Sequence, residues 1–370
     1  MPLNTFGTNT SYDIIKGANF QSIIDFGEQK VWDAVAVTLN AYNALVQDQL
    51  KDFVTDTTER LTMYGSTTSN FRFQEMDEMG TPQAQKGKPG AIIGLPLKDY
   101  QAAIAWNRRY MQNHSPSDLA GQVDQVLIGD VLLLQYNIQK TLFTGVNYST
   151  TDPLIDHQEA FPIPVRALVN ADGLPIPPGQ NGRRFDPTTH THYMAINGVT
   201  NTWLRAVIEN VIEHYNRGSA VIFISSSDET SISALADFKA FTYATVIKSA
   251  NQEYGQGVLD EIDIYNRQIG WFRGAAVWTK PWMPAGYVFA FMKGNPAPIA
   301  RRIRAANPMG TNGGPAATNA GELFVSFEDE SHPLYAKAWE REYGMGIKER
   351  TNGVVGYMGG NTYVAPALTY

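Results

Sequence analysis

The chain has 370 residues, 43% of them apolar, which is enough to bury a core and excludes wholesale disorder. It contains no cysteine, which excludes a disulfide framework, thiolate metal sites and cysteine catalysis. The formal net charge is −7 and no long basic run occurs, so we expect only weak, non-specific contact with DNA. The N-terminus lacks a signal-peptide pattern and no segment is apolar enough to span a membrane, which predicts a cytoplasmic origin and no membrane contact.

The N-terminal part of the chain predicts an arm, a helix and a hairpin. Residues 1–27 are polar and weakly periodic, which indicates an extended arm, and over residues 31–53 apolar side chains recur at helical steps. Residues 71–73 then alternate as in a strand, residues 80–90 are turn formers, and residues 92–97 are again extended. A lone two-stranded hairpin is marginally stable in water, so we expect this one to pack on another surface.

The clearest helix of the chain begins after Ser115. Ser115 can cap it, Pro116 suits its first turn, and Asp118 completes a Ser-x-x-Asp capping box. Apolar residues follow helical steps as far as Phe143, so the helix would be about 40 Å long at 1.5 Å per residue. After it, residues 145–198 are rich in Pro, Gly and Asn and predict only short extended pieces.

The remainder of the chain predicts an α/β unit followed by strands. An amphipathic helix is expected over Thr202–Arg217, with His214 in its last turn and Gly218 at its end. A buried strand follows over residues 220–224, and residues 225–228 supply caps for a further helix. More strands are expected over Ile262–Tyr265, Ile269–Thr279, Gly286–Met292, Pro298–Ile303, Leu323–Phe327 and Ala336–Ile347.

This order of elements resembles that of the major capsid proteins of tailed bacteriophages, the Hong Kong ninety-seven-type fold that encapsulin shells share. Several local strings are also similar to the family's: Asp77-Glu78-Met79-Gly80 followed by Pro96–Tyr100, Pro284–Gly286 leading into Tyr287–Met292, and Trp339–Ile347 followed by Gly353–Val355. The match spans nearly the whole chain, and the order of elements carries it more than any single string.

The resemblance implies an α+β fold with five parts. These are an N-terminal arm and helix (1–57), an extended E-loop hairpin (58–112), a P domain with a long spine helix and a β-sheet (113–198), an α/β A domain (199–319), and return strands of the P domain (320–370). The hairpin and the arm would bury their apolar residues on adjacent subunits and enlarge the interfaces between them.

The function that the resemblance implies is structural and not enzymatic. Many copies would assemble as hexamers and pentamers, in the host cytoplasm, into the icosahedral shell of a virion that encloses phage DNA. No cofactor is implied. The chain shows no long, charged, helical scaffolding segment, so a scaffolding protein is expected to be separate. The resemblance also implies a portal and decoration proteins as partners. An encapsulin-like compartment around protein cargo is the first alternative.

A metal-dependent enzyme centred on His190 and His192 is the alternative from another class. On a strand the two imidazoles would share one face, as zinc ligands often do, and Asp186 lies nearby. A catalytic site needs a third ligand, and no spacing points to His157 or His214. We therefore expect two polar strand residues, with no metal, cofactor or catalytic group.

Covalent cross-linking is a second question that the resemblance raises. Some capsids join an E-loop lysine to a P-domain asparagine of a neighbouring subunit, and here Lys86 and Lys88 would be the lysines, with Asn352 or Asn361 as acceptor. The attack needs a neutral amine in a dry pocket, whereas Lys86 and Lys88 are flanked by Gly and Pro. We expect solvated lysines at an inter-subunit hairpin tip and no cross-link.

Three weaker motifs have simpler explanations. Ser225-Ser-Ser-Asp228 lies between a strand and a helix but lacks a nucleophile elbow, so it is expected to cap the helix. Asp260, Glu261 and Asp263 fit a solvated turn better than an oxygen-ligated ion site. Gly344-x-Gly346 lacks the third glycine of a dinucleotide loop.

Overall fold

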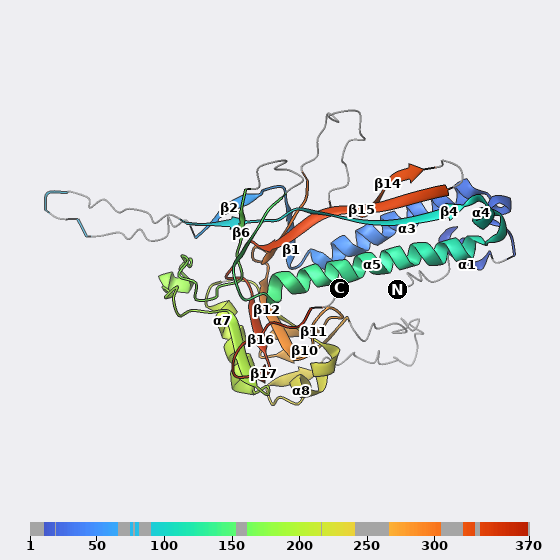
Figure 1. The fold of residues 1–370 in the computed structure, drawn as a ribbon. Coiled ribbons are helices and arrows are strands. Elements are labelled where there is room, and N and C mark those ends of the chain that lie inside the picture. The colour runs from blue at the N-terminus through green and yellow to red at the C-terminus, as the bar shows by residue number, and fades with distance from the viewer. Residues whose placement is uncertain are drawn as a thin grey trace, which may run out of the picture.

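The structure is a computed structural model that describes residues 11–18, 20–65, 75–76, 78–80, 90–152, 161–215, 217–240, 266–304, 321–329 and 334–368. Figure 1 shows two parts, an elongated layer of helices and strands and a compact lobe below one end of it. Among the described helices, none combines the length and the apolar character needed to cross a bilayer.

The elongated layer consists of two long helices packed against a five-stranded sheet. The helices are α3 (Glu28–Leu50) and α5 (Pro116–Phe143), which extend along the long strands of the sheet (Figure 1). The strands are β1 (Val54–Thr57), β13 (Ile299–Arg302), β15 (Leu334–Ile347), β14 (Phe324–Asp329) and β4 (Lys98–Asn107). The long β15 holds the sheet together, because it pairs antiparallel with β13, β14 and β4.

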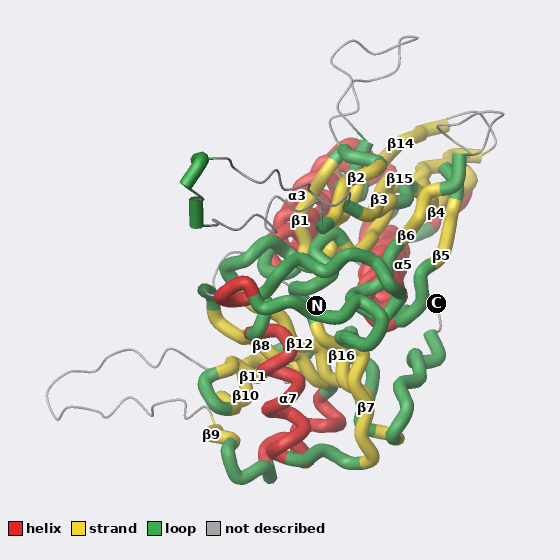
Figure 2. The backbone as a smooth tube through the Cα atoms, turned by 90° about the vertical axis from the view of Figure 1, so that its left-hand side faces the viewer, coloured by secondary structure: helices red, strands yellow, loops and turns green. Residues whose placement is uncertain are grey.

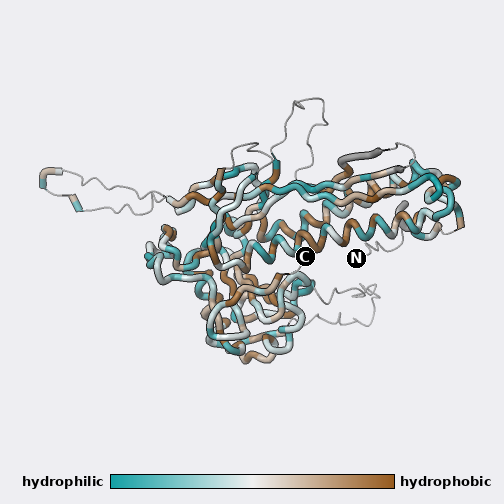
Figure 3. The backbone as a smooth tube through the Cα atoms, viewed as in Figure 1, coloured by the Kyte–Doolittle hydropathy of each residue, from teal (hydrophilic) through white to brown (hydrophobic). Residues whose placement is uncertain are grey.

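Helix α5 follows the sequence prediction closely. Ser115 Oγ accepts a hydrogen bond from the Asp118 backbone N–H, and the Asp118 carboxylate accepts one from Ser115 N–H. The alternation of apolar and polar residues along α5 is visible in Figure 3. Its inward face is buried in the larger of two hydrophobic cores, which also includes residues of α3 and β15 and is called the main core below. This burial explains why the helical pattern extends over 28 residues.

The N-terminal segment differs from the extended arm expected for residues 1–27. The described part forms two short helices, α1 (Ser11–Gly17) and α2 (Ile23–Phe26), and a third short helix, α4 (Arg108–Asn113), follows β4. Ile15 and Ile23 are fully buried in the protein's own main core, and Lys16 Nζ lies 2.6 Å from the Asp124 carboxylate on α5. Burial of these two isoleucines favours helical turns that the weak local periodicity does not predict. Residues 1–10 lie outside the described residues.

The compact lobe contains an eight-stranded sheet. Its strands are, in spatial order, β17 (Gly359–Gly360), β7 (Tyr193–Asn197), β16 (Val354–Tyr357), β12 (Tyr287–Lys293), β8 (Ser219–Ile224), β11 (Ala275–Thr279), β10 (Arg267–Phe272) and β9 (Phe238–Ala240). Helix α7 (Asn201–Ile212) packs on one face (Figure 2), and the short α8 (Glu229–Ser233) follows the 3₁₀ turn Ser226–Asp228 after β8.

Strand β12 joins the two parts of the molecule. Val288 and Ala290 face α7 in the core of the lobe, whereas Phe289 and Phe291 face the main core. There Phe291 packs near Phe53, which directly precedes β1, with ring centroids 6.3 Å apart. A strand covered on both faces reads as a continuous apolar run, as this one does.

The predicted hairpin is present at its root. Strands β2 (Leu61–Tyr64) and β3 (Ala91–Gly94) pair antiparallel, and β5 (Tyr148–Thr150) and β6 (Ile163–Val165) form a second small sheet beside them. The strand expected around residues 71–73 and the tip at residues 81–89 lie outside the described residues.

The segment after β3 is clamped to the five-stranded sheet. The Arg302 guanidinium donates to Leu95 O at 2.8 Å and to the buried Asp152 carboxylate at 2.5 Å. Asp152 also accepts from Leu97 N–H at 3.1 Å. A Cβ at Gly344 of β15 would lie 2.1 Å from Pro96 O, so glycine is required for this close approach.

Two predicted elements have different limits in the structure. The single strand expected over Ile269–Thr279 is a hairpin of β10 and β11, because Arg273 and Gly274 both have positive φ, at 48° and 89°, and form a tight turn. The helix expected over Thr202–Arg217 ends at Ile212.

Sheet membership does not follow chain order in the last third of the chain. Strand β13 lies in the five-stranded sheet with β15, while β16 and β17 lie in the lobe. The chain therefore crosses between the two parts on both sides of residue 320, and pairing partners far apart in sequence decide where each strand belongs.

Candidate functional site

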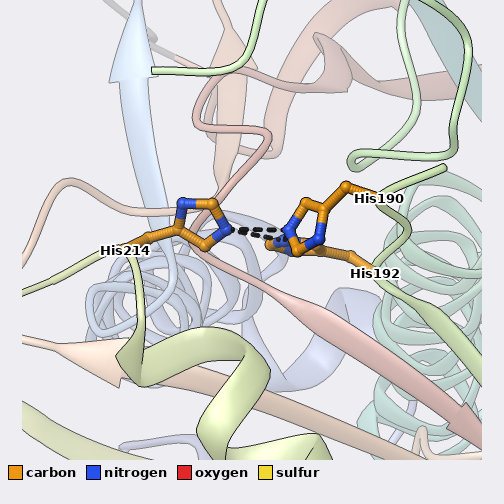
Figure 4. Close-up of side chains that lie close together, drawn as sticks. All are labelled: His190, His192 and His214. Atoms are coloured by element: carbon orange, nitrogen blue, oxygen red, sulfur yellow. Dashed lines mark hydrogen bonds between the residues drawn. The ribbon is translucent and has the colours of Figure 1, made fainter. Parts of the chain in front are cut away.

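The side chains of three histidines of the lobe lie close together, as Figure 4 shows. His190 and His192 precede β7, and His214 follows the end of α7. Their Nε2 atoms lie 3.2 Å apart for His190 and His192, and 3.1 Å apart for each of these with His214. Three nitrogen atoms from two segments of the chain thus converge on one point.

Backbone hydrogen bonds fix the segment that carries His190 and His192. His190 N–H donates to Asp186 O at 2.9 Å, within a turn in which the Asp186 side chain also accepts from Thr188. His192 N–H donates to Val169 O at 2.7 Å, and its carbonyl accepts from Val355 N–H at 2.8 Å. Because this segment is hydrogen-bonded to Val169 on one side and to Val355 on the other, the two imidazoles have little freedom to move apart.

His214 reaches the site because α7 ends earlier than the sequence predicts. Gln180 Nε2 donates to Ile212 O at 2.5 Å and also to Tyr215 O, and Gln180 N–H donates to Glu213 O at 3.0 Å. These bonds occupy the carbonyl groups at the helix end and turn the chain out of the helix. In an uninterrupted helix, His214 would occupy the last turn instead.

The three imidazoles are shielded from water to different degrees. The Phe185 ring covers His190 and His214, with ring centroids 4.6 and 4.2 Å away, and His192 is fully buried. Burial lowers the pKa of His190 and of His192, and lowers the pKa of His214 to about 3. The imidazoles are therefore neutral at neutral pH, the form that binds metal ions.

An ion pair borders the cluster on its exposed side. Glu213 Oε1 lies 3.5 Å from His190 Nε2, and Arg183 Nη1 lies 2.8 Å from Glu213 Oε2. Burial raises the pKa of Glu213, while the guanidinium of Arg183 opposes the shift. A carboxylate is thus held next to the three nitrogen atoms.

The sequence identified two of the three imidazoles. It placed His190 and His192 together but did not point to His214, so the expectation of an incomplete ligand set is wrong for these residues. The H-x-H pair followed by a histidine at the end of the next helix was the available signal, but the contacts of Gln180 with that end are not visible in the local sequence. His157 lies outside the described residues.

The weaker motifs have structural roles where they are described. Ser225 accepts from Ser227 N–H at 3.4 Å and so caps the 3₁₀ turn that precedes α8. Asp228 makes no side-chain cap for α8, and its carboxylate instead accepts from Gly286 N–H at 2.8 Å, so the predicted cap is confirmed only for Ser225. A Cβ at Gly346 would lie 2.7 Å from the Leu95 side chain, so this glycine, like Gly344, allows close packing. Residues 260–263 lie outside the described residues.

No protein-family model matches the sequence, and no curated protein sequence matches it. Among solved structures, a chain from Mycobacterium phage Patience is similar over 99% of this chain and 97% of its own, with a TM-score of 0.64 and 18% identity. The chain has the tailed-phage capsid fold. The expected α+β capsid fold is therefore confirmed.

Two further structures with capsid-fold likeness have lower TM-scores and add nothing to this assignment. The capsid of a native GTA particle is 12% identical over 84% of this chain and 89% of its own, with a TM-score of 0.46. An encapsulin complex from Synechococcus elongatus is 9% identical over 89% of this chain and 90% of its own, with a TM-score of 0.40.

The two asparagines considered as cross-link acceptors in a capsid fold lie in different environments. Asn352 is fully buried, and its amide bonds to both backbone groups of Met292 and to Pro296 O. Asn361 is exposed and accepts from Asn197 N–H at 3.2 Å. Lys86 and Lys88 lie outside the described residues, so no lysine–asparagine geometry is defined.

Proposed function

We propose that this chain is a structural major capsid protein that assembles as hexamers and pentamers into an icosahedral shell around phage DNA. The observation that carries the proposal is the likeness, over nearly the full length of both chains, to a structure from Mycobacterium phage Patience. A protein of this kind binds mainly to copies of itself, and we assign it no catalytic role.

The parts of the molecule fit the domains of such a subunit. We assign the elongated layer, with α5 as its spine helix, to the P domain and the lobe to the A domain. Strands β2 and β3 form the root of the proposed E-loop. We assign Lys86 and Lys88, which lie outside the described residues, to its tip. The assignment places β13 in the P domain and β16 and β17 in the A domain, unlike a division by residue number alone.

The hairpin root presents an apolar face that a neighbouring subunit would cover. Met63 and Ile92 are directly paired across the two strands, and Leu61 lies on the same face. These side chains are 57%, 47% and 49% exposed, respectively. The opposite face, with Tyr64 and Ile93, is buried within the subunit. A two-stranded sheet with both faces apolar is suited to join two subunits.

The same proposal implies partners and a location. A separate scaffolding protein, a portal and decoration proteins would complete the particle, which forms in the host cytoplasm and becomes the virion. The net charge of −7 suits a wall that contacts packaged DNA weakly and without sequence preference. An encapsulin-like compartment is the alternative, and its particles would contain protein cargo in place of DNA.

Electron microscopy and sedimentation of the purified protein over a range of concentrations test self-assembly. Capsomers or closed particles at high concentration are the expected result. A sharply monomeric species at every concentration and salt level would contradict the proposal. Portal and terminase genes beside this gene would favour a phage capsid, whereas a neighbouring cargo enzyme would favour the compartment.

We also propose that mature particles contain no covalent cross-link. The Asn352 carboxamide is buried and uses its oxygen and nitrogen in bonds to the backbone, so a lysine would have to displace these bonds to reach it. On a denaturing gel after boiling, we expect a single band near 40.9 kDa. A ladder of oligomers would contradict the proposal. If the ladder disappears in Lys86→Ala or Lys88→Ala and also in Asn361→Ala, the exposed asparagine is the acceptor.

A further inference from the structure

The hydrogen-bonding capacity of the three clustered imidazoles does not account for their arrangement. Each neutral imidazole has one N–H and one nitrogen lone pair in the ring plane. His192 Nδ1 lies 2.6 Å from Gly353 O and must carry the hydrogen of that bond, so His192 Nε2 has only a lone pair. Each Nε2 atom has either one hydrogen or one lone pair, so hydrogen bonds can account for only one of the three contacts of 3.1–3.2 Å.

The second nitrogen of His214 adds to this imbalance. His214 Nδ1 is buried and has no hydrogen-bond partner among the described residues. If Nδ1 carries the hydrogen, a donor is buried without an acceptor, and His214 Nε2 adds another lone pair to the cluster. If Nε2 carries it, Nδ1 is a buried acceptor without a donor. Hydrogen bonds among the described residues therefore satisfy neither tautomer, and the tautomer with the hydrogen on Nδ1 leaves the Nε2 lone pair available to an ion.

We propose that His190, His192 and His214 bind a divalent metal ion of the zinc class through their three Nε2 atoms. The point in their plane that is equidistant from these atoms lies about 1.8 Å from each of them. An ion at the usual zinc–imidazole distance of about 2.0–2.1 Å would lie about 1 Å outside that plane, with N–metal–N angles of about 100°. This geometry is that of three corners of a tetrahedron.

The chemistry of the ligand set selects the class of ion. Imidazole nitrogen suits zinc and its neighbours among the transition metals, whereas Mg²⁺ and Ca²⁺ prefer oxygen ligands. The bond from His192 Nδ1 to Gly353 O fixes the ring with Nε2 facing the ion, which is the usual outer contact of a metal-binding histidine. Glu213 supplies a negative charge beside His190 that complements a dication.

The role of this site is to hold the lobe together. His190 and His192 precede β7, and His214 follows α7, so one ion would join the two ends of the β7–α7 unit. Three protein ligands leave the ion's fourth position open, but Phe185 covers two of the imidazoles and His192 is fully buried, which restricts the approach of a substrate. An ion bound only by the folded chain stabilises the folded state. This inference does not depend on shell assembly.

Metal content of tag-free protein is the direct test, because a polyhistidine tag would itself bind zinc. After dialysis against zinc and then metal-free buffer, we expect close to one zinc per chain in the wild type. The zinc content of His214→Ala should be at least tenfold lower. His114→Ala is the matched control, because His114 is exposed and lies at the end of α4, and it should retain the zinc. Cobalt in place of zinc should give the intense visible absorption of a four-coordinate ion.

Melting temperature provides the second readout. A chelator should lower the melting temperature of the wild type and stoichiometric zinc should restore it, with no such response in His214→Ala. If His214→Ala is insoluble, His190→Gln replaces it, and the chelation cycle of the wild type remains decisive. Wild-type protein that binds no zinc, or zinc that is retained equally in the His214 or His190 variant, would overturn the proposal.

Discussion

At the scale of single residues, buried arginines recur where distant segments of the chain meet. Arg341 of β15 is 1% exposed and pairs with Asp130 of α5, whose carboxylate also accepts from the Tyr42 hydroxyl of α3 at 2.6 Å. Burial and the Asp130 charge raise the pKa of Tyr42, so this hydroxyl keeps its proton. One carboxylate thus links both long helices to the sheet.

Removing that carboxylate's charge should destabilise the subunit strongly. Asp130→Asn leaves the Arg341 guanidinium buried without its counter-charge, which costs about 3–5 kcal/mol in free energy of unfolding. Urea unfolding of unassembled protein measures the loss. Asp48→Asn is the matched control, since Asp48 lies on α3 with its ion pair to Lys51 exposed, and it should change stability by about 0–1 kcal/mol. Equal effects of the two changes would contradict the role of burial.

Asp172 makes the contribution of another buried arginine dependent on pH. Arg350 is fully buried and donates to Asp172 at 2.6 Å. Burial alone would raise the pKa of Asp172, but hydrogen bonds from Asn147 and Arg350 outweigh it and lower the pKa. The unfolded chain, in which aspartate titrates near pH about 3.9, therefore binds the proton more readily than the folded chain.

The stability contributed by the Asp172 carboxylate should be complete above pH about 4 and lost at lower pH. Melting temperatures of wild type and Asp172→Asn, compared from pH 7 downward, should differ most at pH 7 and converge in acid. A difference that stays constant down to pH 2 would show that ionisation of Asp172 is not the cause.

At the scale of elements, the capping box of α5 is the clearest case of a prediction with a measurable energy. Ser115→Ala removes the acceptor for the Asp118 N–H and should cost about 1 kcal/mol, whereas Ser115→Gly should cost only a few tenths. Denaturant midpoints of the two variants test this order. A larger loss for glycine than for alanine would mean that backbone freedom, rather than the cap, controls this helix end.

The elements that sequence could predict are those whose signals are local. The cap of α5, its apolar periodicity and the apolar run of β12 lie within one segment, and each predicted element is confirmed. The N-terminal helices and the early end of α7 depend on contacts with residues far along the chain, such as Ile15 with the main core and Gln180 with Ile212. No local pattern contains that information.

At the scale of the whole molecule, the order of elements predicted the fold, but the pairing of strands from distant segments is known only from the structure. Strands β13 and β15 share one sheet, whereas β16 lies between β7 and β12 in the lobe. This arrangement follows from the pairing of strands and not from composition. The same is true of the histidine cluster, whose third member arrives from another element.

Assembly should depend on the apolar face at the hairpin root. Met63→Thr with Ile92→Thr keeps residues that favour strands but removes apolar area that a neighbour would bury. We expect the subunit's melting temperature to change little and the concentration needed for assembly to rise at least about tenfold, since each lost contact is worth on the order of 1 kcal/mol. Light scattering against concentration measures the threshold, and an unchanged threshold would exclude this face from the interface.

The clamp between residues 95–97 and the sheet has a mechanical consequence. To swing the hairpin about its root, the chain would have to separate Arg302 from Asp152 and Leu95 O, and to open the close approach at Gly344. The root is therefore a rigid joint, and a pull on the hairpin is transmitted as torque to β13 and β15. When neighbouring subunits shift against one another, we expect the root of the hairpin and the sheet to rotate together as one rigid body.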